Sequence, residues 1–279
     1  MQLHYSLWKP QNSLPSANLV FLHGMGGTGA LWRPIAASLE DSMAILAPDQ
    51  RGHGRSQIPH VPASREPARY TPLDYGRDVV ELIDALNFKP CFLVGHSMGV
   101  RTACAAAHLM TSPSLRGLIL IDLGFSGPAG GGLGQGLYDF LQILPMEFET
   151  REAARAFMNE RCPDPSIAQY LMAVSVVGAD RRLLFPFDKA ALLETLNAAR
   201  DASVRKWVRD LGARGLPILV LRGAKSLVWK REEFEAERAA FGDLPSVVFE
   251  EFPETGHGLP FERRVEFVER VKRFVSEAK

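Results

Sequence analysis

The chain has 279 residues, of which 46% are hydrophobic, and its 32 basic and 32 acidic side chains give a formal net charge of zero. This length allows one large α/β domain with room for an insertion, and the neutral balance excludes a global field that would attract nucleic acid or an anionic membrane. No apolar run approaches the roughly 18 residues that span a bilayer, and the first residues show neither the basic region nor the apolar region typical of a signal peptide. We therefore expect a cytoplasmic protein with no stable membrane association and a small-molecule partner.

Apolar runs alternate with amphipathic segments along most of the chain, which predicts an α/β fold with a mostly parallel sheet covered by helices on both faces. The predicted strands are 19–22, 43–47, 91–94, 118–121, 217–221 and 247–252. The predicted helices that cover them are 31–39, 73–86, 100–110 and an amphipathic C-terminal segment whose apolar stripe runs from Phe261 to Val275.

A glycine-rich loop follows the first predicted strand, in the order Leu22-His23-Gly24-Met25-Gly26-Gly27-Thr28-Gly29. Glycines let a backbone approach a ligand closely with its N–H groups turned inward, and we expect the Met25 N–H to serve in this way. The alternative is a glycine turn with no ligand. A phosphate cradle is disfavoured because the lysine and hydroxyl of a P-loop are missing.

The predicted strand 91–94 ends in Gly95-His96-Ser97-Met98-Gly99, and a run of small residues suited to a helix follows. A serine in this G-x-S-x-G context occupies a strained turn between strand and helix that exposes its hydroxyl, so Ser97 is the candidate nucleophile. The alternative is an ordinary glycine turn. A serine hydroxyl needs a base, a group that orients the base, and donors for an oxyanion; the N–H of Met98 and that of Met25 are the expected donors.

The alternation of strands and helices lapses between residues 126 and 211. The segment opens with the glycine-rich stretch 127–136 and continues into helical patterns at 151–159, 167–177 and 189–199. We expect 126–211 to form an inserted helical cap over Ser97, with 1–125 and 212–279 as the core. The alternative is a helical bulge on the sheet edge, remote from Ser97.

The candidate base is His257, in Glu254-Thr255-Gly256-His257-Gly258-Leu259, directly after the last predicted strand. Catalytic groups gather at the carboxyl ends of the strands in open α/β sheets, and an imidazole can take a proton from serine and return it to a leaving group. The alternative is a surface histidine. The seven histidines show no spacing typical of zinc ligands, so we expect no metal.

Four motifs in this order resemble the α/β-hydrolase superfamily: the H-G loop at His23-Gly24, the stretch Asp49-Gln50-Arg51-Gly52-His53-Gly54-Arg55-Ser56, the elbow at Ser97, and Gly256-His257-Gly258. The resemblance covers nearly the whole chain. It implies an eight-stranded sheet with a cap inserted after the sixth strand, and it implies that the Asp49 stretch is a structural turn at the pocket floor, outside the chemistry.

The acid of the expected triad departs from the commonest pattern in that superfamily. Most members carry it after the seventh strand, in a string resembling R-G-x-x-S-D, where this chain has Arg222-Gly223-Ala224-Lys225-Ser226-Leu227. Leucine cannot orient an imidazole. Asp122, at the end of the predicted strand 118–121, is the preferred replacement, as in the bacterial carboxylesterases and a related mitochondrial group that this chain resembles. The alternatives are that Asp122 caps a turn and that Glu232 or Glu233 is the acid.

These residues predict a serine esterase that works by two-step acyl transfer with Ser97, His257 and Asp122 and requires no metal or organic cofactor. The apolar residues of the expected cap suit short to medium acyl or aryl esters. A thioester, a lactone or a carbon–carbon bond is an alternative substrate for the same triad. A ligand-binding receptor with little turnover is the alternative outside enzymes.

Overall fold

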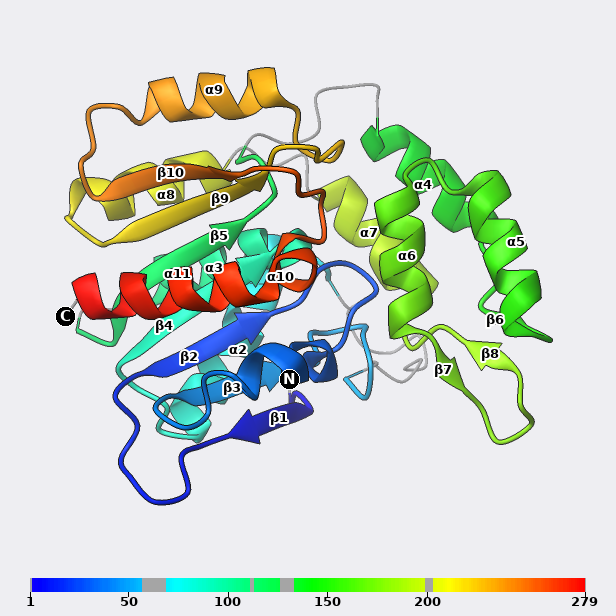
Figure 1. Ribbon diagram of the computed structural model, residues 1–279, viewed down its shortest axis with the longest axis horizontal. Helices are drawn as coiled ribbons and strands as arrows, with labels where there is room; N and C mark the ends of the chain where they lie inside the picture. The colour runs from blue at the N-terminus through cyan, green and yellow to red at the C-terminus, as the bar shows by residue number, and fades with distance from the viewer. Residues whose placement is uncertain (1, 57–68, 111–112, 126–132, 199–202, 279) are drawn as a thin grey trace.

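The computed structural model describes residues 2–56, 69–110, 113–125, 133–198 and 203–278. Figure 1 shows two parts: a sheet with helices on both faces, and a helical cap that stands beside the carboxyl ends of the strands. The cap lies between β5 and β9 in the chain order. The chain therefore has the α/β-hydrolase fold that the sequence predicts.

The central sheet has seven strands, in the order β1-β3-β2-β4-β5-β9-β10. All neighbours are parallel except β1, which pairs antiparallel with β3. All six predicted strands are present, and β1 was not predicted. The strands are β1 (Tyr5–Trp8), β2 (Asn18–Leu22), β3 (Ala44–Pro48), β4 (Cys91–His96), β5 (Leu115–Ile121), β9 (Ile218–Gly223) and β10 (Val247–Phe252).

The strand count corrects two details that the resemblance implied. The sheet has seven strands instead of eight, and the cap follows the fifth strand in chain order, β5, instead of the sixth. Within the described residues β1 forms one edge of the sheet and pairs only with β3. The residues between β1 and β2 form no strand that could pair with the outer side of β1. The parallel strands that carry the candidate site are unaffected, because they lie away from this edge.

Both faces of the sheet are buried, which explains why its strands read as continuous apolar runs rather than as alternating patterns. Val20 and Leu22 of β2 belong to the hydrophobic cluster on one face, and Leu19 and Phe21 belong to the cluster on the other. Side chains alternate between faces along each strand, so a strand buried on both sides is apolar at every position.

Two groups of helices cover these faces, and Figure 1 shows α11 in front of the sheet with α2 and α3 behind it. The 3-10 helix η1 (Gly29–Trp32), α1 (Arg33–Ala36) and α11 (Arg264–Glu277) cover one face. The other face packs against α2 (Pro72–Ala85), α3 (Met98–Leu109), α8 (Ser203–Ala213) and α9 (Arg231–Ala240). The short α10 (Leu259–Glu262) precedes α11. Most of helix α8 lies in the segment 126–211 that was expected to be cap, yet the helix packs on α3 and the sheet.

The described part of the cap combines four helices with a small antiparallel sheet, which the sequence analysis did not predict. Its apolar side chains form a separate hydrophobic cluster. The elements are α4 (Leu133–Ile143), β6 (Glu147–Phe148), α5 (Arg151–Arg161), α6 (Pro165–Val174), β7 (Val176–Val177), β8 (Leu183–Leu184) and α7 (Lys189–Ala198). Residues 127–132 of the expected glycine-rich stretch 127–136 lie outside the described residues, and α4 begins directly after them.

The turn from Asp49 to Ser56 joins the core to the cap. The carboxylate of Asp49 accepts hydrogen bonds from the N–H groups of Gly29 at 2.7 Å and Arg55 at 2.9 Å, which fixes the turn beside the glycine-rich loop. The turn then pairs with the cap through Gly54 N–H to Pro186 O and Asp188 N–H to Gly52 O. A structural role was predicted for this turn, but it anchors the cap instead of lining the pocket floor.

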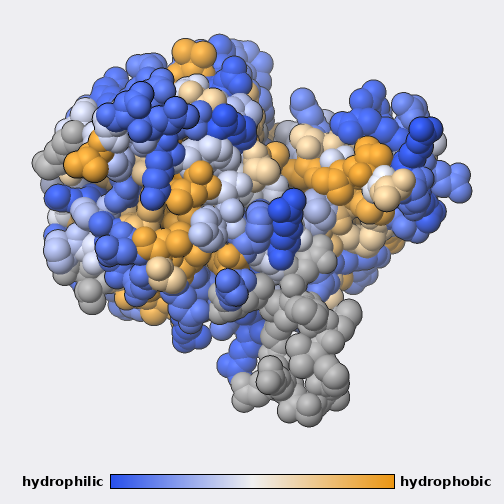
Figure 2. All heavy atoms as spheres, turned by 90° about the horizontal axis from the view of Figure 1, so that it is seen from below, coloured by the Kyte–Doolittle hydropathy of each residue, from blue (hydrophilic) through white to orange (hydrophobic). Residues whose placement is uncertain are grey.

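Apolar surface remains on the assembled molecule, and Figure 2 shows an orange band that extends from the junction of the two parts onto the cap. Within the described residues, no helix combines the length and apolar character needed to cross a membrane.

Three buried histidines make stability depend on pH. Burial lowers the pKa of His23 to about 4 and the pKa values of His53 and His96 to about 3, from an ordinary value of 6.5. Below pH 6.5 the unfolded chain binds protons that the folded chain does not, so the free energy of unfolding should fall by up to about 1.4 kcal/mol per pH unit for each histidine. Urea unfolding at pH 7.5 and 5.0 measures this loss.

His53→Gln isolates one of these contributions, because glutamine keeps a donor for the carbonyl of Arg51 that the His53 ring contacts at 2.9 Å. The variant should lose less stability than the wild type between pH 7.5 and 5.0, whatever its stability at pH 7.5. An identical loss in both proteins would show that His53 is not a buried neutral histidine.

Candidate active site

Ser97 lies between β4 and α3 with a backbone φ of 54°, a conformation that side chains rarely adopt. Two close approaches make this turn possible. A Cβ at Gly95 would lie 2.3 Å from the carbonyl oxygen of Gly99, and a Cβ at Gly99 would lie 2.3 Å from that of Leu22. The G-x-S-x-G spacing is therefore required by backbone packing, and it leaves the Ser97 side chain facing the cavity.

Asp122 occupies the matching position at the end of the neighbouring strand β5, and its backbone φ is also 54°. The sheet continues past both residues, because Ser97 N–H donates to Ile121 O at 2.9 Å and Asp122 N–H donates to Leu221 O at 2.8 Å. These bonds hold both residues in their unusual conformations. The sequence analysis predicted the positions of the two side chains but not the strained backbone of Asp122.

His257 enters from the loop between β10 and α10, and two other side chains hold this loop. The carboxylate of Glu262 accepts hydrogen bonds from Gly256 N–H at 2.8 Å and Gly258 N–H at 3.0 Å, one on each side of the histidine. The ring of His96 lies 2.8 Å from the carbonyl oxygen of His257. Because burial lowers the pKa of His96, its ring is neutral, and Nε2–H is the donor to this carbonyl.

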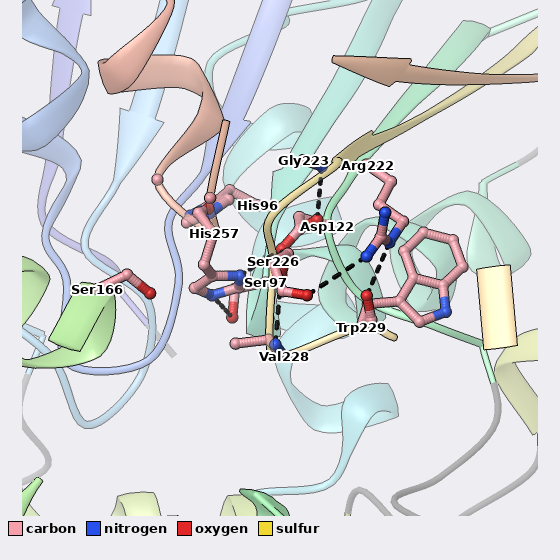
Figure 3. A network of polar contacts seen from close by, with 12 residues as sticks. His96, Ser97, Asp122, Ser166, Arg222, Gly223, Ser226, Val228, Trp229 and His257 are labelled. Atoms are coloured by element: carbon pink, nitrogen blue, oxygen red, sulfur yellow. Dashed lines mark hydrogen bonds and ion pairs between the residues drawn. The ribbon is translucent and has the colours of Figure 1, made fainter. Parts of the chain in front are cut away.

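The structure brings the three sequence-predicted side chains together (Figure 3). His257 Nε2 lies 3.0 Å from Ser97 Oγ, and His257 Nδ1 lies 2.7 Å from Asp122 Oδ2. Because the Asp122 carboxylate only accepts hydrogen bonds, Nδ1 carries the proton and Nε2 is the acceptor that faces the serine hydroxyl. Asp122 is fully buried and His257 is 7% exposed. This geometry can transfer the proton of a serine nucleophile to a base.

The loop after β9, which lacks the usual acid, supports Asp122 instead. Ser226 Oγ donates to Asp122 Oδ2 at 2.5 Å, and Gly223 N–H donates to Asp122 Oδ1 at 2.8 Å. The buried guanidinium of Arg222 shapes this loop through Trp229 O at 2.7 Å and Ser226 O at 3.3 Å (Figure 3). The Asp122 carboxylate therefore accepts one neutral donor at each oxygen in addition to the imidazole.

The rival acids lie on helix α9, and Glu233 lines the same cavity as Ser97. Glu232 and Glu233 are in the first turn of α9, and Glu233 accepts a hydrogen bond from the N–H of Lys230. Leu227, at the position of the usual acid, is 61% exposed and lines the cavity mouth. The Nδ1 atom of His257 is already bonded to Asp122. The contacts of the imidazole thus favour Asp122 over either glutamate.

The two expected oxyanion donors flank the serine. Met98 is the first residue of α3, so its N–H is one of those that the helix leaves without an internal acceptor. Met25 is in the glycine-rich loop, where a Cβ on the preceding Gly24 would lie 3.1 Å from the Cβ of Ser97. Both methionines line the same cavity as Ser97 and His257.

This cavity has a volume of about 400 Å³ and lies between the cap and the carboxyl ends of the strands. The cap contributes mainly apolar side chains to its wall, from α4, α6 and α7. They include Leu137, Leu141, Ile167, Leu171, Leu192 and Leu196. Charged side chains from α3, α8 and α9 line another part of the wall, where Arg205 pairs with the buried Glu237 at 2.9 Å. The described part of the cap therefore does lie over Ser97.

Sequence reasoning missed three side chains that hold this site. His96 belongs to the elbow motif, and its contact with the backbone of His257 was not predicted. Ser226 donates a hydrogen bond to Asp122, and Glu262 accepts one from Gly256 N–H in the loop that carries His257. For Ser226 a signal was present, because it belongs to the string R-G-x-x-S in which only the final acid is replaced.

Ser226→Ala should slow the reaction of Ser97 with a fluorophosphonate about tenfold, because the Asp122 carboxylate loses a donor that orients it; tenfold corresponds to about 1.4 kcal/mol. Labelling rates measured by intact-protein mass spectrometry check this. The matched control is Ser246→Ala, which removes the hydrogen bond from Ser246 Oγ to Gly212 O at 2.7 Å, before β10. An equal rate for wild type and Ser226→Ala would show that Asp122 does not need this donor.

Comparison with known proteins gives several relatives. The chain is 30% identical to the 2-(acetamidomethylene)succinate hydrolase of Mesorhizobium japonicum, over 82% of this chain and 78% of that protein. It is 25% identical to the sn-1-specific diacylglycerol lipase ABHD11 of Mus musculus, over 99% of this chain and 86% of that protein. A match at 39% identity to a RutD protein of Variovorax paradoxus spans only 36% of this chain and 34% of that protein.

Solved structures show the same fold. A marine microorganism esterase superposes with a TM-score of 0.74 and 20% identity, covering 98% of this chain and 99% of that one. The sequence profile described as the Alpha/beta hydrolase family matches residues 19–270. With the fold, the site geometry and the relatives in agreement, this chain belongs to the alpha/beta hydrolase family, and it is a hydrolase.

Proposed function

We propose that this hydrolase is a serine carboxylesterase that cleaves short to medium acyl or aryl esters with Ser97, His257 and Asp122 as its catalytic triad. The observation that carries the proposal is the position of His257, whose ring bridges Ser97 Oγ at 3.0 Å and Asp122 Oδ2 at 2.7 Å at the wall of a cavity whose cap side is apolar. Each of these residues follows a different strand at the carboxyl end of the sheet: Ser97 follows β4, Asp122 follows β5 and His257 follows β10.

The reaction begins when Ser97 Oγ attacks the ester carbonyl and His257 Nε2 takes its proton. The carbonyl oxygen becomes an oxyanion that the N–H groups of Met25 and Met98 stabilise. His257 then gives the proton to the leaving alcohol as the bond between carbonyl carbon and alkoxy oxygen breaks, leaving Ser97 acylated. A water molecule, deprotonated by the same imidazole, then attacks the acyl-enzyme. The imidazolium returns this proton to Ser97 Oγ as the bond between acyl carbon and Oγ breaks, which releases the acid and restores the free serine. Asp122 stabilises the imidazolium in both steps.

The cavity supports the choice of ester. Its volume of about 400 Å³ lies in the range of small-molecule sites, and its cap side is lined by leucine and isoleucine side chains that favour an apolar group. The zero net charge of the chain provides no field for nucleic acid. An uncharged small-molecule ester of the cytoplasm is therefore the partner that we propose.

The same mechanism can cleave substrates of other classes. A thioester, a lactone or a carbon–carbon bond next to a carbonyl also passes through an oxyanion, so the triad alone does not select among them. The names of the relatives indicate an ester lipid in one case and 2-(acetamidomethylene)succinate in the other. The leucine and isoleucine side chains on the cap side of the cavity favour the ester over the dicarboxylate for this chain.

The test is hydrolysis of p-nitrophenyl acetate, butyrate, octanoate and palmitate by the wild type and by Ser97→Ala. The wild type should turn over many times, with the highest kcat/KM at acetate to octanoate, because a cavity of about 400 Å³ does not enclose a palmitoyl chain. Ser97→Ala should lose at least about 10³-fold in kcat, since no nucleophile remains. Undiminished turnover by Ser97→Ala would contradict the proposed mechanism.

Retention of the acyl group distinguishes an enzyme from a receptor. Mass spectrometry after mixing with p-nitrophenyl butyrate should show an acyl-enzyme at Ser97 that decays within the turnover time. A stable single acylation with no further product would show a ligand-binding protein, and no reaction at Ser97 would exclude esters as the substrate class.

A further inference from the structure

The cap contributes one polar contact directly beside the nucleophile. Tyr170, on α6, lines the cavity, and its hydroxyl lies 3.3 Å from the carbonyl oxygen of Gly24. This carbonyl belongs to the same peptide group as the N–H of Met25. Because a peptide group is planar, a hydrogen bond that fixes its C=O also fixes the direction of its N–H.

Three donors converge on the Gly24 carbonyl. Besides the Tyr170 hydroxyl, they are Gly27 N–H at 3.0 Å and His23 Nδ1 at 2.8 Å. The tautomer of His23 follows from its other nitrogen, because Nε2 accepts a hydrogen bond from Gln50 N–H at 3.0 Å and Nδ1 must then carry the proton. Two of the three donors come from the core, and only the tyrosine comes from the cap.

The tyrosine is held firmly in this position. Asp164 is the N-cap of its helix, and the Asp164 carboxylate accepts hydrogen bonds from Ser166 N–H at 2.7 Å and Ile167 N–H at 3.1 Å. A Cβ at Gly27 would lie 2.2 Å from the Tyr170 hydroxyl oxygen, so glycine is needed there to admit the phenol. Burial raises the pKa of Tyr170, and the hydroxyl therefore remains a donor at neutral and mildly alkaline pH.

Leu171 and Phe187 complete the contact between the cap and this loop. A Cβ at Gly26 would lie 2.8 Å from Leu171 Cδ2 and 3.2 Å from Phe187 Cε1, and Met25 packs against the hydrophobic cluster of the cap. The loop that supplies the expected oxyanion donor is therefore enclosed between core and cap. Within this contact Tyr170 provides the hydrogen bond that the apolar neighbours cannot provide.

We propose that Tyr170 is a positioning residue for acyl transfer: its hydroxyl holds the Gly24–Met25 peptide from the cap side and keeps the Met25 N–H directed at the oxyanion. The inference rests on the proposed function, because it assumes that an oxyanion forms at Ser97. It makes the cap a part of the catalytic machinery as well as a cover for the cavity, since a displaced cap would release one of the three bonds on the Gly24 carbonyl.

Tyr170→Phe removes the hydroxyl and keeps the ring, so the shape of the cavity is preserved. On the p-nitrophenyl ester that the wild type hydrolyses best, kcat/KM should fall about tenfold, which corresponds to about 1.4 kcal/mol of transition-state stabilisation. A trifluoromethyl ketone with the same acyl chain forms a tetrahedral adduct with an oxyanion, and its inhibition constant should rise by the same factor. The matching methyl ketone stays trigonal, and its inhibition constant should not change.

Tyr138→Phe is the matched control, because Tyr138 lies on the cap helix α4 and does not belong to the set of residues that lines the cavity. It should leave all three constants unchanged. Equal weakening of both ketones by Tyr170→Phe would show that Tyr170 only shapes the cavity, and no weakening of either would show that its hydroxyl has no role. Both results overturn the inference.

The proposed function and this inference fail in different ways. If the wild type hydrolyses esters and Ser97→Ala does not, the function stands whatever Tyr170→Phe does. If the wild type neither hydrolyses an ester nor reacts with the trifluoromethyl ketone, the proposed function fails, and the inference is overturned with it.

Discussion

A buried carboxylate at the end of β5 is the constraint on which the site depends. Asp122 is fully buried, and burial of a charged group is costly unless hydrogen bonds satisfy it. Three donors do so: Gly223 N–H, Ser226 Oγ and His257 Nδ1. They come from β9, from the loop after it and from the loop after β10, so satisfying one carboxylate brings three segments of the chain together. His257 reaches Ser97 because its other ring nitrogen is held by this carboxylate.

The position of the acid also explains the loop after β9. Since Asp122 fills the place beside His257, the loop has no need of an acid, and Ser226 turns its hydroxyl toward Asp122. Leu227 is then left at the cavity mouth, where it lines the wall. The buried Arg222 maintains this arrangement by bonding to the carbonyls of Ser226 and Trp229. A carboxylate at the end of β5 thus holds the imidazole, while the neighbouring loop after β9 carries no acid.

Much of the fold could be predicted because its signals are local. Strands buried on both faces read as apolar runs, and the elbow and the His257 loop follow directly after such runs. The cap was harder to predict. Two-residue strands such as Glu147–Phe148 are too short to show a periodic pattern. The first turn of α4 contains Gly134 and Gly136, and these glycines favoured the prediction of a loop there. Helix α8 has an amphipathic pattern, but only tertiary packing on α3 shows that it belongs to the core.

The site residues also fall into two groups: those that a local sequence pattern marks and those that act through contacts with distant parts of the chain. Ser97 and His257 are recognisable because glycine spacing marks them, and Asp122 because it ends a strand next to the serine strand. The residues that hold them are separated from them by long stretches of sequence, as with Tyr170 and Gly24, which are 146 residues apart, or Ser226 and Asp122, which are 104 apart. A local pattern such as R-G-x-x-S can mark Ser226, but it does not reveal which distant residue the side chain contacts. Such contacts arise only when the strands order themselves and the cap folds over the loop.

The central claim is that Asp122 is the acid of the triad, and the most direct test is kcat/KM for p-nitrophenyl butyrate in Asp122→Asn, Glu232→Gln and Glu233→Gln, with urea unfolding to verify the fold of each. Asp122→Asn should lose about 10⁴-fold, because the amide cannot stabilise the imidazolium, while both glutamine variants stay near the wild type. Near-normal turnover in Asp122→Asn, together with collapse in either glutamine variant, would contradict the account.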